Sequence, residues 1–162
     1  MDSFKYALEA STPQIKAAGG EIREGNKKTF PALDGLAIFS LILKPGAVRI
    51  PHWHPDANEL DYVIQGRAEI AIVGPDEFKT SFEVGKGEIS LIPRAWFHSI
   101  RNPGPGDLHV LVIFNNADPD DIGISVGLGG MSPVVLSETL GAPADVFANF
   151  RSDVLFIAPQ DE

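Results

Sequence analysis

The chain of 162 residues contains no cysteine, so it can form no disulfide and offers neither a thiolate nucleophile nor a sulfur ligand for a metal. No apolar run approaches the roughly 20 residues that a membrane-spanning helix needs. The first residues, MDSFKYALEASTPQIK, lack the basic stretch and apolar core of a secretory signal, and no Asn-x-Ser/Thr acceptor site is present. We therefore expect a cytoplasmic protein with no membrane partner, although a mature secreted chain would share these features.

Basic side chains are few. Lys and Arg number 13 against 22 Asp and Glu, which gives a net charge of −9. A surface that binds nucleic acid needs concentrated Lys and Arg, so we expect no nucleic-acid partner. An anionic substrate would need a local cation to offset the overall negative field. The hydrophobic content of 44% and charged content of 22% are those of a globular protein, and the length suits a single core.

From residue 31 to residue 116 the sequence consists of short apolar segments separated by turn residues. Segments such as RAEIAIV and LHVLVIF are rich in strand-forming side chains, whereas KPGA, GPDE and NPGPGD carry turn chemistry. Many short strands at this spacing predict one all-β domain, either a barrel or a double-sheet jelly roll. The expected strands cover residues 35–43, 61–65, 67–73, 80–84, 88–93, 97–101 and 108–114.

Two flanking segments differ in character from this region. Residues 1–30 are polar and mixed, and we expect an arm that lies over the barrel or over a neighbouring subunit. Residues 117–131 are rich in Gly and Asp. Because a loop of this length is unusual in a compact domain and is often functional, we expect it to act as a lid.

Residues 132–162 contain two predicted short helices and a tail. The segment SPVVLSETLG has a start and a stop signal, with Ser132 as the cap, Pro133 at the first helical position and Gly141 just beyond the end. The segment APADVFANF, residues 142–150, predicts the second helix. The helices therefore follow the all-β region rather than interrupt it.

The stretch RIPHWHPDANELDYVIQG suggests a metal site. In a strand, His52 and His54 point to one face and Trp53 to the other. PDAN predicts a turn, and if the strands on either side pair antiparallel, the Glu59 carboxylate comes within reach of both rings. His98 would complete the set from an adjacent strand, and three imidazoles with one carboxylate suit a divalent first-row metal. The alternative is a polar turn between two strands, with His98 as a core residue.

These residues fall into two motifs that resemble those of the cupin superfamily. The first motif, G-x5-H-x-H-x3,4-E-x6-G, is matched by Gly46, His52, His54, Glu59 and Gly66. The second, G-x5-P-x-G-x2-H-x3-N, is matched by Gly87, Pro93, His98 and Asn102, with Ala95 in place of the glycine. The resemblance implies a cupin barrel, a double-stranded β-helix, over residues 31–116. It also implies that His52, His54, Glu59 and His98 bind a metal.

Within this superfamily the chain looks most like the modules of oxalate decarboxylases and germin-type oxalate oxidases. The decarboxylase stretch G-A-x-R-x-x-H-W-H has its counterpart here between Gly46 and His54. The resemblance implies a manganese centre, with Fe²⁺, Zn²⁺ and Ni²⁺ as alternatives, and oxalate or another small carboxylate as substrate. It gives Arg49 the role of binding the substrate carboxylate. A regular strand would put Arg49 and His52 on opposite faces. The substrate-binding role therefore requires an irregularity such as a bulge at Pro51. The alternative is that Arg49 is a surface residue.

The lid of the decarboxylase modules carries a glutamate that serves in proton transfer, and this chain has no glutamate there. An ungapped comparison from Phe114 places Asp121 at that position, with Asp120 beside it. Asp121 is therefore the candidate catalytic carboxylate, and the alternative is a solvated turn. Aspartate is shorter than glutamate by one methylene, so its carboxylate would be displaced from the position used for proton transfer. This difference argues against decarboxylation in particular.

Three functions remain open from the sequence. The first is a manganese enzyme that acts on oxalate or another small carboxylate. The second is a different metal-dependent cupin, either an iron dioxygenase or an isomerase. Iron is possible because manganese and iron both accept this ligand set. The third is a protein that binds a metal or carboxylate without turnover, or a storage protein. In the two-domain relatives the helices that follow each module pack against the partner barrel, so we expect a homodimer or higher homo-oligomer.

Overall fold

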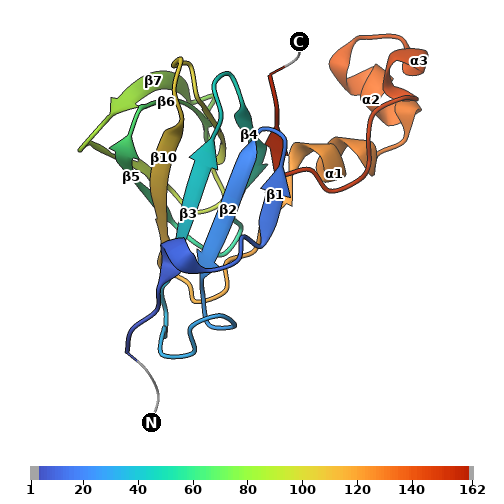
Figure 1. Ribbon diagram of the computed structural model, residues 1–162. Helices are drawn as coiled ribbons and strands as arrows, with labels where there is room; N and C mark the ends of the chain where they lie inside the picture. The colour runs from blue at the N-terminus through green and yellow to red at the C-terminus, as the bar shows by residue number, and fades with distance from the viewer. Residues whose placement is uncertain (1–3, 161–162) are drawn as a thin grey trace.

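The computed structural model describes residues 4–160, and its strands form two antiparallel sheets that enclose the core (Figure 1). The first sheet runs in the order β1 (Ile15–Ala17), β2 (Gly20–Gly25), β3 (Ala37–Leu43), β10 (Leu108–Phe114), β5 (Glu59–Gln65) and β8 (Ile89–Ile92). The second runs β11 (Ile122–Gly123), β4 (Val48–Trp53), β9 (Phe97–Arg101), β6 (Arg67–Val73) and β7 (Lys79–Gly85), and β12 (Ile157–Ala158) also pairs with β4. The predicted all-β, double-sheet fold is confirmed.

Alternation along the strands builds the core. In β10 every second residue, from Leu108 to Phe114, is buried, and the residues between them are half-buried. β6 follows the same pattern with Ala68, Ile70 and Ile72. Because side chains of a strand point alternately to its two faces, this pattern turns one face of each sheet toward the interior.

The structure differs from the arm expected over residues 1–30. A short 3₁₀ turn (Leu8–Ala10) is followed by β1 and β2, and β2 pairs with β3 so that Ile22 lies opposite Leu41. The segment 15–25 is thus part of the first sheet. The sequence did not predict β2 because the strand is mostly polar. Ile22 is the single large apolar side chain of β2 that faces the core. The added strands cover the edge that β3 would otherwise expose.

The expected loop over residues 117–131 also contains regular structure. β11 pairs with β4, with Gly123 opposite His52, and α1 (Ile124–Gly129) follows directly. This pairing ties the segment to the strand that carries the histidines. The lid-like loop is therefore shorter than expected and ends at residue 121.

The two predicted C-terminal helices are present. α2 (Pro133–Leu140) begins after Ser132, whose Oγ accepts a hydrogen bond from the Val135 N–H, and ends at Gly141, which has a φ of 71°. α3 (Ala144–Phe147) lies inside the expected range. Figure 1 shows α2 and α3 projecting from one side of the sheets. Within residues 4–160 no helix has the length and apolarity needed to cross a membrane.

Backbone conformation explains the glycines of the two sequence motifs. Gly46, Gly66 and Gly87 have φ values of 73°, 83° and 85°, in the left-handed region that disfavours side chains. Ala95, which replaces the fourth motif glycine, has a φ of 65°. These turns position the strands that carry the candidate ligands, and the alanine performs this role under strain.

Candidate metal centre

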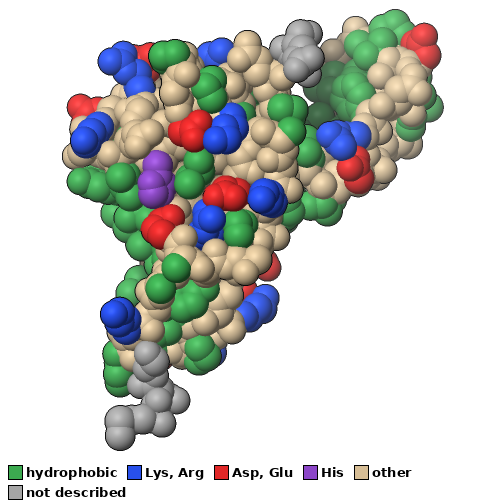
Figure 2. Space-filling view, in the orientation of Figure 1, with side chains coloured by type: hydrophobic (Ala, Val, Ile, Leu, Met, Phe, Trp, Pro, Cys, Tyr) green, Lys and Arg blue, Asp and Glu red, His purple; other side chains and the backbone are tan. Residues whose placement is uncertain are grey.

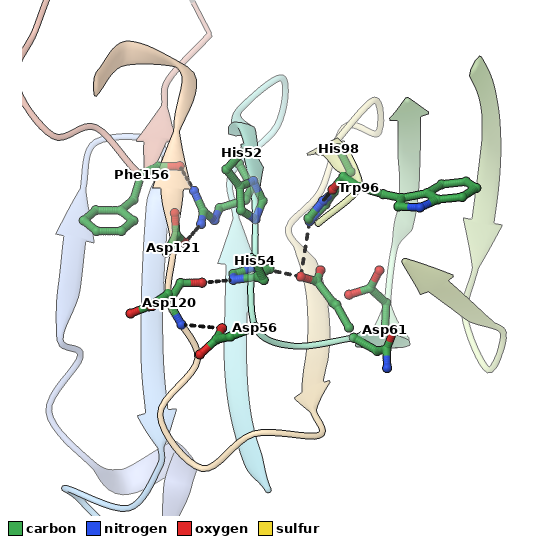
Figure 3. Close-up of polar contacts among 12 residues, drawn as sticks. His52, His54, Asp56, Asp61, Trp96, His98, Asp120, Asp121 and Phe156 are labelled. Atoms are coloured by element: carbon green, nitrogen blue, oxygen red, sulfur yellow. Dashed lines mark hydrogen bonds and ion pairs between the residues drawn. The ribbon is translucent and has the colours of Figure 1, made fainter. Parts of the chain in front are cut away.

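His52, His54, Glu59 and His98 converge in the interior between the two sheets. β4 pairs with β9 so that His52 lies directly opposite His98. One ligand atom from each of the four residues lies within 4.8 Å of the others. All four side chains are buried. Figure 3 shows the three imidazoles turned toward a common point.

Glu59 reaches this point from a direction that differs from the sequence-based expectation. β5 does not pair with β4; it belongs to the first sheet, where it pairs with β10 and β8. The Glu59 carboxylate therefore extends across the interior, and its Oε2 lies 3.0 Å from His54 Nε2 and 3.2 Å from His98 Nε2. Trp53 lies on the outer face, as predicted, with its ring centroid 5.8 Å from that of Phe97.

Backbone carbonyls orient all three imidazoles. The Nδ1 atom of His52 lies 2.7 Å from the Ile50 carbonyl oxygen, and that of His98 lies 3.0 Å from the Trp96 carbonyl oxygen. His54 Nδ1 lies 2.6 Å from the carbonyl oxygen of Asp120. A carbonyl can only accept, so each Nδ1 carries a proton, and a ring in its neutral form has its Nε2 lone pair available for a metal. This arrangement is typical of histidines that bind a metal.

Burial and charge set the protonation of the cluster. Burial, assisted by the Arg49 charge, holds the pKa of His52 well below its usual value, so this ring is neutral. Burial would raise the pKa of Glu59, but His98 and His54 together hold that pKa well below its usual range. Burial likewise lowers the pKa of His54, yet the bond to Glu59 outweighs it and the net pKa is raised. An anionic carboxylate thus lies among imidazoles, and Arg49 is the only buried Lys or Arg side chain in the part of the chain described.

A second buried carboxyl supports Glu59 from the same strand. Ser90 Oγ donates to Asp61 Oδ2 at 2.9 Å, whereas Asp61 Oδ1 has no partner among residues 4–160. Burial and the neighbouring Glu59 charge raise the pKa of Asp61 well above its usual range. Protonation of Asp61 leaves Glu59 as the anion of the pair.

The donor set fits a divalent metal ion. Three neutral imidazole nitrogens and one carboxylate oxygen are ligands that first-row divalent metals accept, and no thiolate is available to shift the preference. A cavity of about 220 Å³ opens beside His52, His54 and Glu59, so positions for substrate or water remain on one side. The four predicted residues could therefore hold a metal ion, with room for a small molecule next to it.

Arg49 lies inside this cavity because β4 is irregular. Between Arg49 and His52 the strand advances three residues while β9 advances two, from Ile100 to His98, so a bulge at Pro51 changes the phase. The side chain is buried, with its guanidinium carbon 5.4 Å from the centroid of the Phe156 ring. Arg49 Nη1 donates to the Phe156 carbonyl at 3.2 Å. The alternative of a surface arginine is therefore wrong.

Asp121 forms an ion pair with Arg49 through Oδ2 and Nη2. The preceding loop is tied to the turn after His54: Asp56 accepts from the Asp120 N–H at 3.0 Å and from Asn116 Nδ2 at 2.6 Å. Figure 3 shows Asp56, Asp120 and Asp121 on the same side of His54. The Asp121 carboxylate thus reaches the cavity, although the residue is exposed to solvent.

Several residues that line the cavity could not be assigned to the site from the sequence. Phe156 comes from the C-terminal segment, and Glu24 and Asn26 come from the N-terminal segment expected to be an arm. The alternation of GEIREG was the available signal for β2, whereas the two-residue β12 offers too short a pattern. The backbone carbonyl of Asp120 carries no sequence signal at all.

Comparison with known proteins identifies the family. The family model described as Cupin matches residues 6–146. Germin-like protein 3-7 of Oryza sativa subsp. japonica is 32% identical over 157 residues, which cover 93% of this chain and 67% of that protein. Oxalate decarboxylase OxdC of Bacillus subtilis is 29% identical over 122 residues, which cover 75% of this chain and 31% of that protein.

Solved structures show the same fold. The structure of oxalate decarboxylase from Bacillus subtilis at pH 4.6 superposes with a TM-score of 0.89 at 24% sequence identity, covering 96% of this chain and 41% of that chain. The present chain therefore spans less than half of that enzyme, about the length of one of its modules. The fold, the two motifs and the family match agree, and the chain belongs to the cupin family.

Proposed function

We propose that this protein is a metal-dependent cupin enzyme that acts on a small carboxylate, with oxalate as the first candidate and Mn²⁺ as the first candidate metal. The observation that carries the proposal is the buried Arg49 guanidinium, which shares one cavity with His52, His54 and Glu59. The relatives named as oxalate decarboxylase support the choice of oxalate. The Mn(II) centres of the Bacillus subtilis enzyme support the choice of Mn²⁺.

The residues of the chain can divide the work between binding and proton transfer. A bound divalent ion would supply Lewis-acid polarisation of a carboxylate oxygen. Arg49 offers a planar fork of donors to the same carboxylate, in an interior where charge-assisted hydrogen bonds are strong. Asp121 can accept or return a proton once the substrate has taken its place on Arg49. Apolar side chains such as Val112 and Phe114 line the cavity and limit access of water.

The metal is tested by elemental analysis of protein expressed in medium that contains manganese and iron. We expect about one equivalent of a divalent metal in wild type and a strong loss in His52→Ala and His98→Ala. His109→Ala is the matched control, because His109 bonds to Ser40 outside the cluster. Wild-type protein without metal would overturn the proposal.

Turnover is tested by incubating the metal-loaded protein with oxalate and measuring formate, CO₂ and peroxide. Formate with CO₂ indicates decarboxylation, and peroxide indicates oxidation. Thermal stabilisation by oxalate that is lost in Arg49→Ala, without product, would favour binding without turnover. The existing Arg49–Asp121 ion pair is the observation that favours this second candidate, because an Asp121 carboxylate held by Arg49 is a weaker base for proton transfer.

We also propose that the chain self-associates through its C-terminal helices. α2 and α3 expose the apolar side chains of Val134, Val135, Leu140 and Val146, each at least half exposed. Figure 2 shows hydrophobic side chains on the projecting helical part of the molecule. A cluster of this kind is typical of a surface that a second copy covers.

A further inference from the structure

Glu24 points into the cavity from the sheet that faces β4. Ile22 and Glu24 lie on the inner face of β2, opposite Leu41 and Phe39 of β3, and all four side chains line the cavity. Glu21 and Arg23 alternate with them on the outer face, where they form an ion pair with each other. The Glu24 carboxyl thus lies on the core-facing side of β2 and takes no part in the Glu21–Arg23 ion pair.

The surroundings of Glu24 compensate its charge only in part. Oε2 accepts a hydrogen bond from Asn26 Nδ2 at 2.9 Å. The nearby Lys28 is mostly exposed and bonds to Asp118 at 2.9 Å. Burial raises the pKa of Glu24, Lys28 acts against this shift, and the Asp118 and Asp121 charges add to it. Glu24, Arg49 and Asp121 line the same cavity, so Glu24 shares that cavity with the position proposed for the substrate.

The cavity therefore has two chemically different walls. Arg49 on the β4 side favours an anion, whereas Glu24 on the β2 side repels one. Lys28 also lines the cavity, but its ammonium group is paired with Asp118. The volume of about 220 Å³ suits a molecule of a few heavy atoms, so a ligand on Arg49 would share this small cavity with Glu24.

We infer that Glu24 is a specificity-determining residue that selects carboxylates whose far end carries an uncharged hydrogen-bond donor, a 2-hydroxy acid being the simplest, over dianions. This inference rests on the proposed function, because it assumes that the near end of the ligand is a carboxylate on Arg49. Among the small carboxylates of that function, it favours a 2-hydroxy acid over oxalate, the candidate that the relatives suggest. A hydroxyl at the far end donates to the Glu24 carboxylate in a charge-assisted hydrogen bond. A second carboxylate at that end faces a like charge, which is a repulsive element of specificity.

The test compares Mn²⁺-loaded wild type with Glu24→Gln by titration calorimetry at pH 7.5, with glycolate, acetate and oxalate as probes. The substitution keeps the size of the side chain and an oxygen that can accept from Asn26, so the fold is retained. Glu21→Gln is the matched control, since it removes a charge from the outer face of the same strand. Metal content and melting temperature are measured for each protein, so that changes in loading or folding are separated from changes in specificity.

For wild type we expect glycolate to bind about tenfold more tightly than acetate, the effect of one hydrogen bond to a charged group. In Glu24→Gln the affinity for oxalate should rise about tenfold, as expected for removal of one unit charge several Å away, and the advantage of glycolate over acetate should shrink. Chelation of the metal by a probe contributes equally to both proteins and cancels in their ratio.

The outcomes separate the two proposals. If wild type binds none of the three acids, the proposed function fails and this inference fails with it. If wild type binds them and Glu24→Gln leaves the glycolate, acetate and oxalate affinities in the same ratios, the inference alone is overturned. A change of the same size in Glu21→Gln would also overturn it, because the effect would then reflect net charge rather than the cavity wall.

Discussion

Arg49 and Asp121 are 72 residues apart in sequence and form an ion pair beside the histidine cluster. Arg49 is almost completely buried, whereas Asp121 retains partial contact with solvent. A buried guanidinium without a partner would be costly, so Asp121 stabilises the cavity as long as no other anion is bound. The pair thus makes the loop carboxylate a competitor of any carboxylate that enters.

Arg49→Lys should weaken carboxylate binding by about ten- to hundredfold, the effect of losing a charge-assisted hydrogen bond in a buried site. Lysine keeps the charge but lacks the planar fork that matches a carboxylate. The measurement is calorimetric titration of metal-loaded protein with oxalate and glycolate. Arg101→Lys is the matched control, because Arg101 is exposed and pairs with Glu69 at the surface. Equal affinity in Arg49→Lys and wild type would contradict the role of Arg49.

Asp121→Asn should separate binding from turnover. Removing the competing charge frees Arg49, so the apparent affinity for a carboxylate should increase. If Asp121 transfers a proton, kcat should fall by about a hundredfold or more. Asp120→Asn is the control, since Asp120 contributes its backbone N–H and carbonyl to the site. Increased affinity with unchanged kcat would leave Asp121 as a gate and would contradict its catalytic role.

Local spacing explains why the four candidate ligands could be predicted. His52 and His54 share a face because the strand period is two residues, and His98 follows from the second motif. The bulge at Pro51 was also predictable, since Arg49 could reach the histidine face only through a change of phase. These features depend on strand periodicity and on the spacing within each of the two motifs.

The remaining features depend on pairings between distant segments. Glu59 lies in the sheet opposite β4, although the turn before it predicts a hairpin with that strand. Glu24 and Phe156 enter the cavity from the two ends of the chain, where strands are short and polar side chains obscure the alternation. Sequence periodicity assigns the face of a strand, but it does not identify the neighbour of that strand.

Ala95→Gly should stabilise the protein by about 1 kcal/mol, because the φ of 65° at this position strains a residue with a Cβ atom. A gain of this size corresponds to a melting temperature about 2–4 °C higher for a domain of this length. Ala68→Gly, in the interior of β6, should instead destabilise the fold. Thermal unfolding of both variants checks the prediction, and a lower melting temperature for Ala95→Gly would contradict it.

Val134→Glu should convert an oligomer into smaller species. The substitution places a charge in the exposed apolar cluster of α2 and α3, where a second copy would have to bury it. Light scattering coupled to gel filtration gives the molecular mass. Leu36→Glu is the control, because Leu36 is similarly exposed and lies outside the helices. A monomeric wild type would overturn the proposed self-association.

Glu24 should make the protein less stable as the pH rises, because its pKa is raised in the folded state. Because burial, against the opposing charge of Lys28, raises this pKa above 4.5, the folded state keeps a proton that the unfolded chain releases. The stability contributed by that proton is fully present below pH 4.5 and is lost as the pH rises through the folded pKa. Glu24→Gln has no such proton to lose.

The melting temperature of Glu24→Gln relative to wild type should therefore increase from about pH 4 to about pH 7, with both proteins kept metal-free by chelator. Glu21→Gln, whose side chain lies beside Arg23 on the outer face, controls for the loss of one charge from β2. A difference that stays constant across this range would mean that the Glu24 carboxyl titrates alike in the folded and unfolded states. The cavity wall would then be more hydrated than its burial indicates, and the repulsion proposed against a second carboxylate would be correspondingly weak.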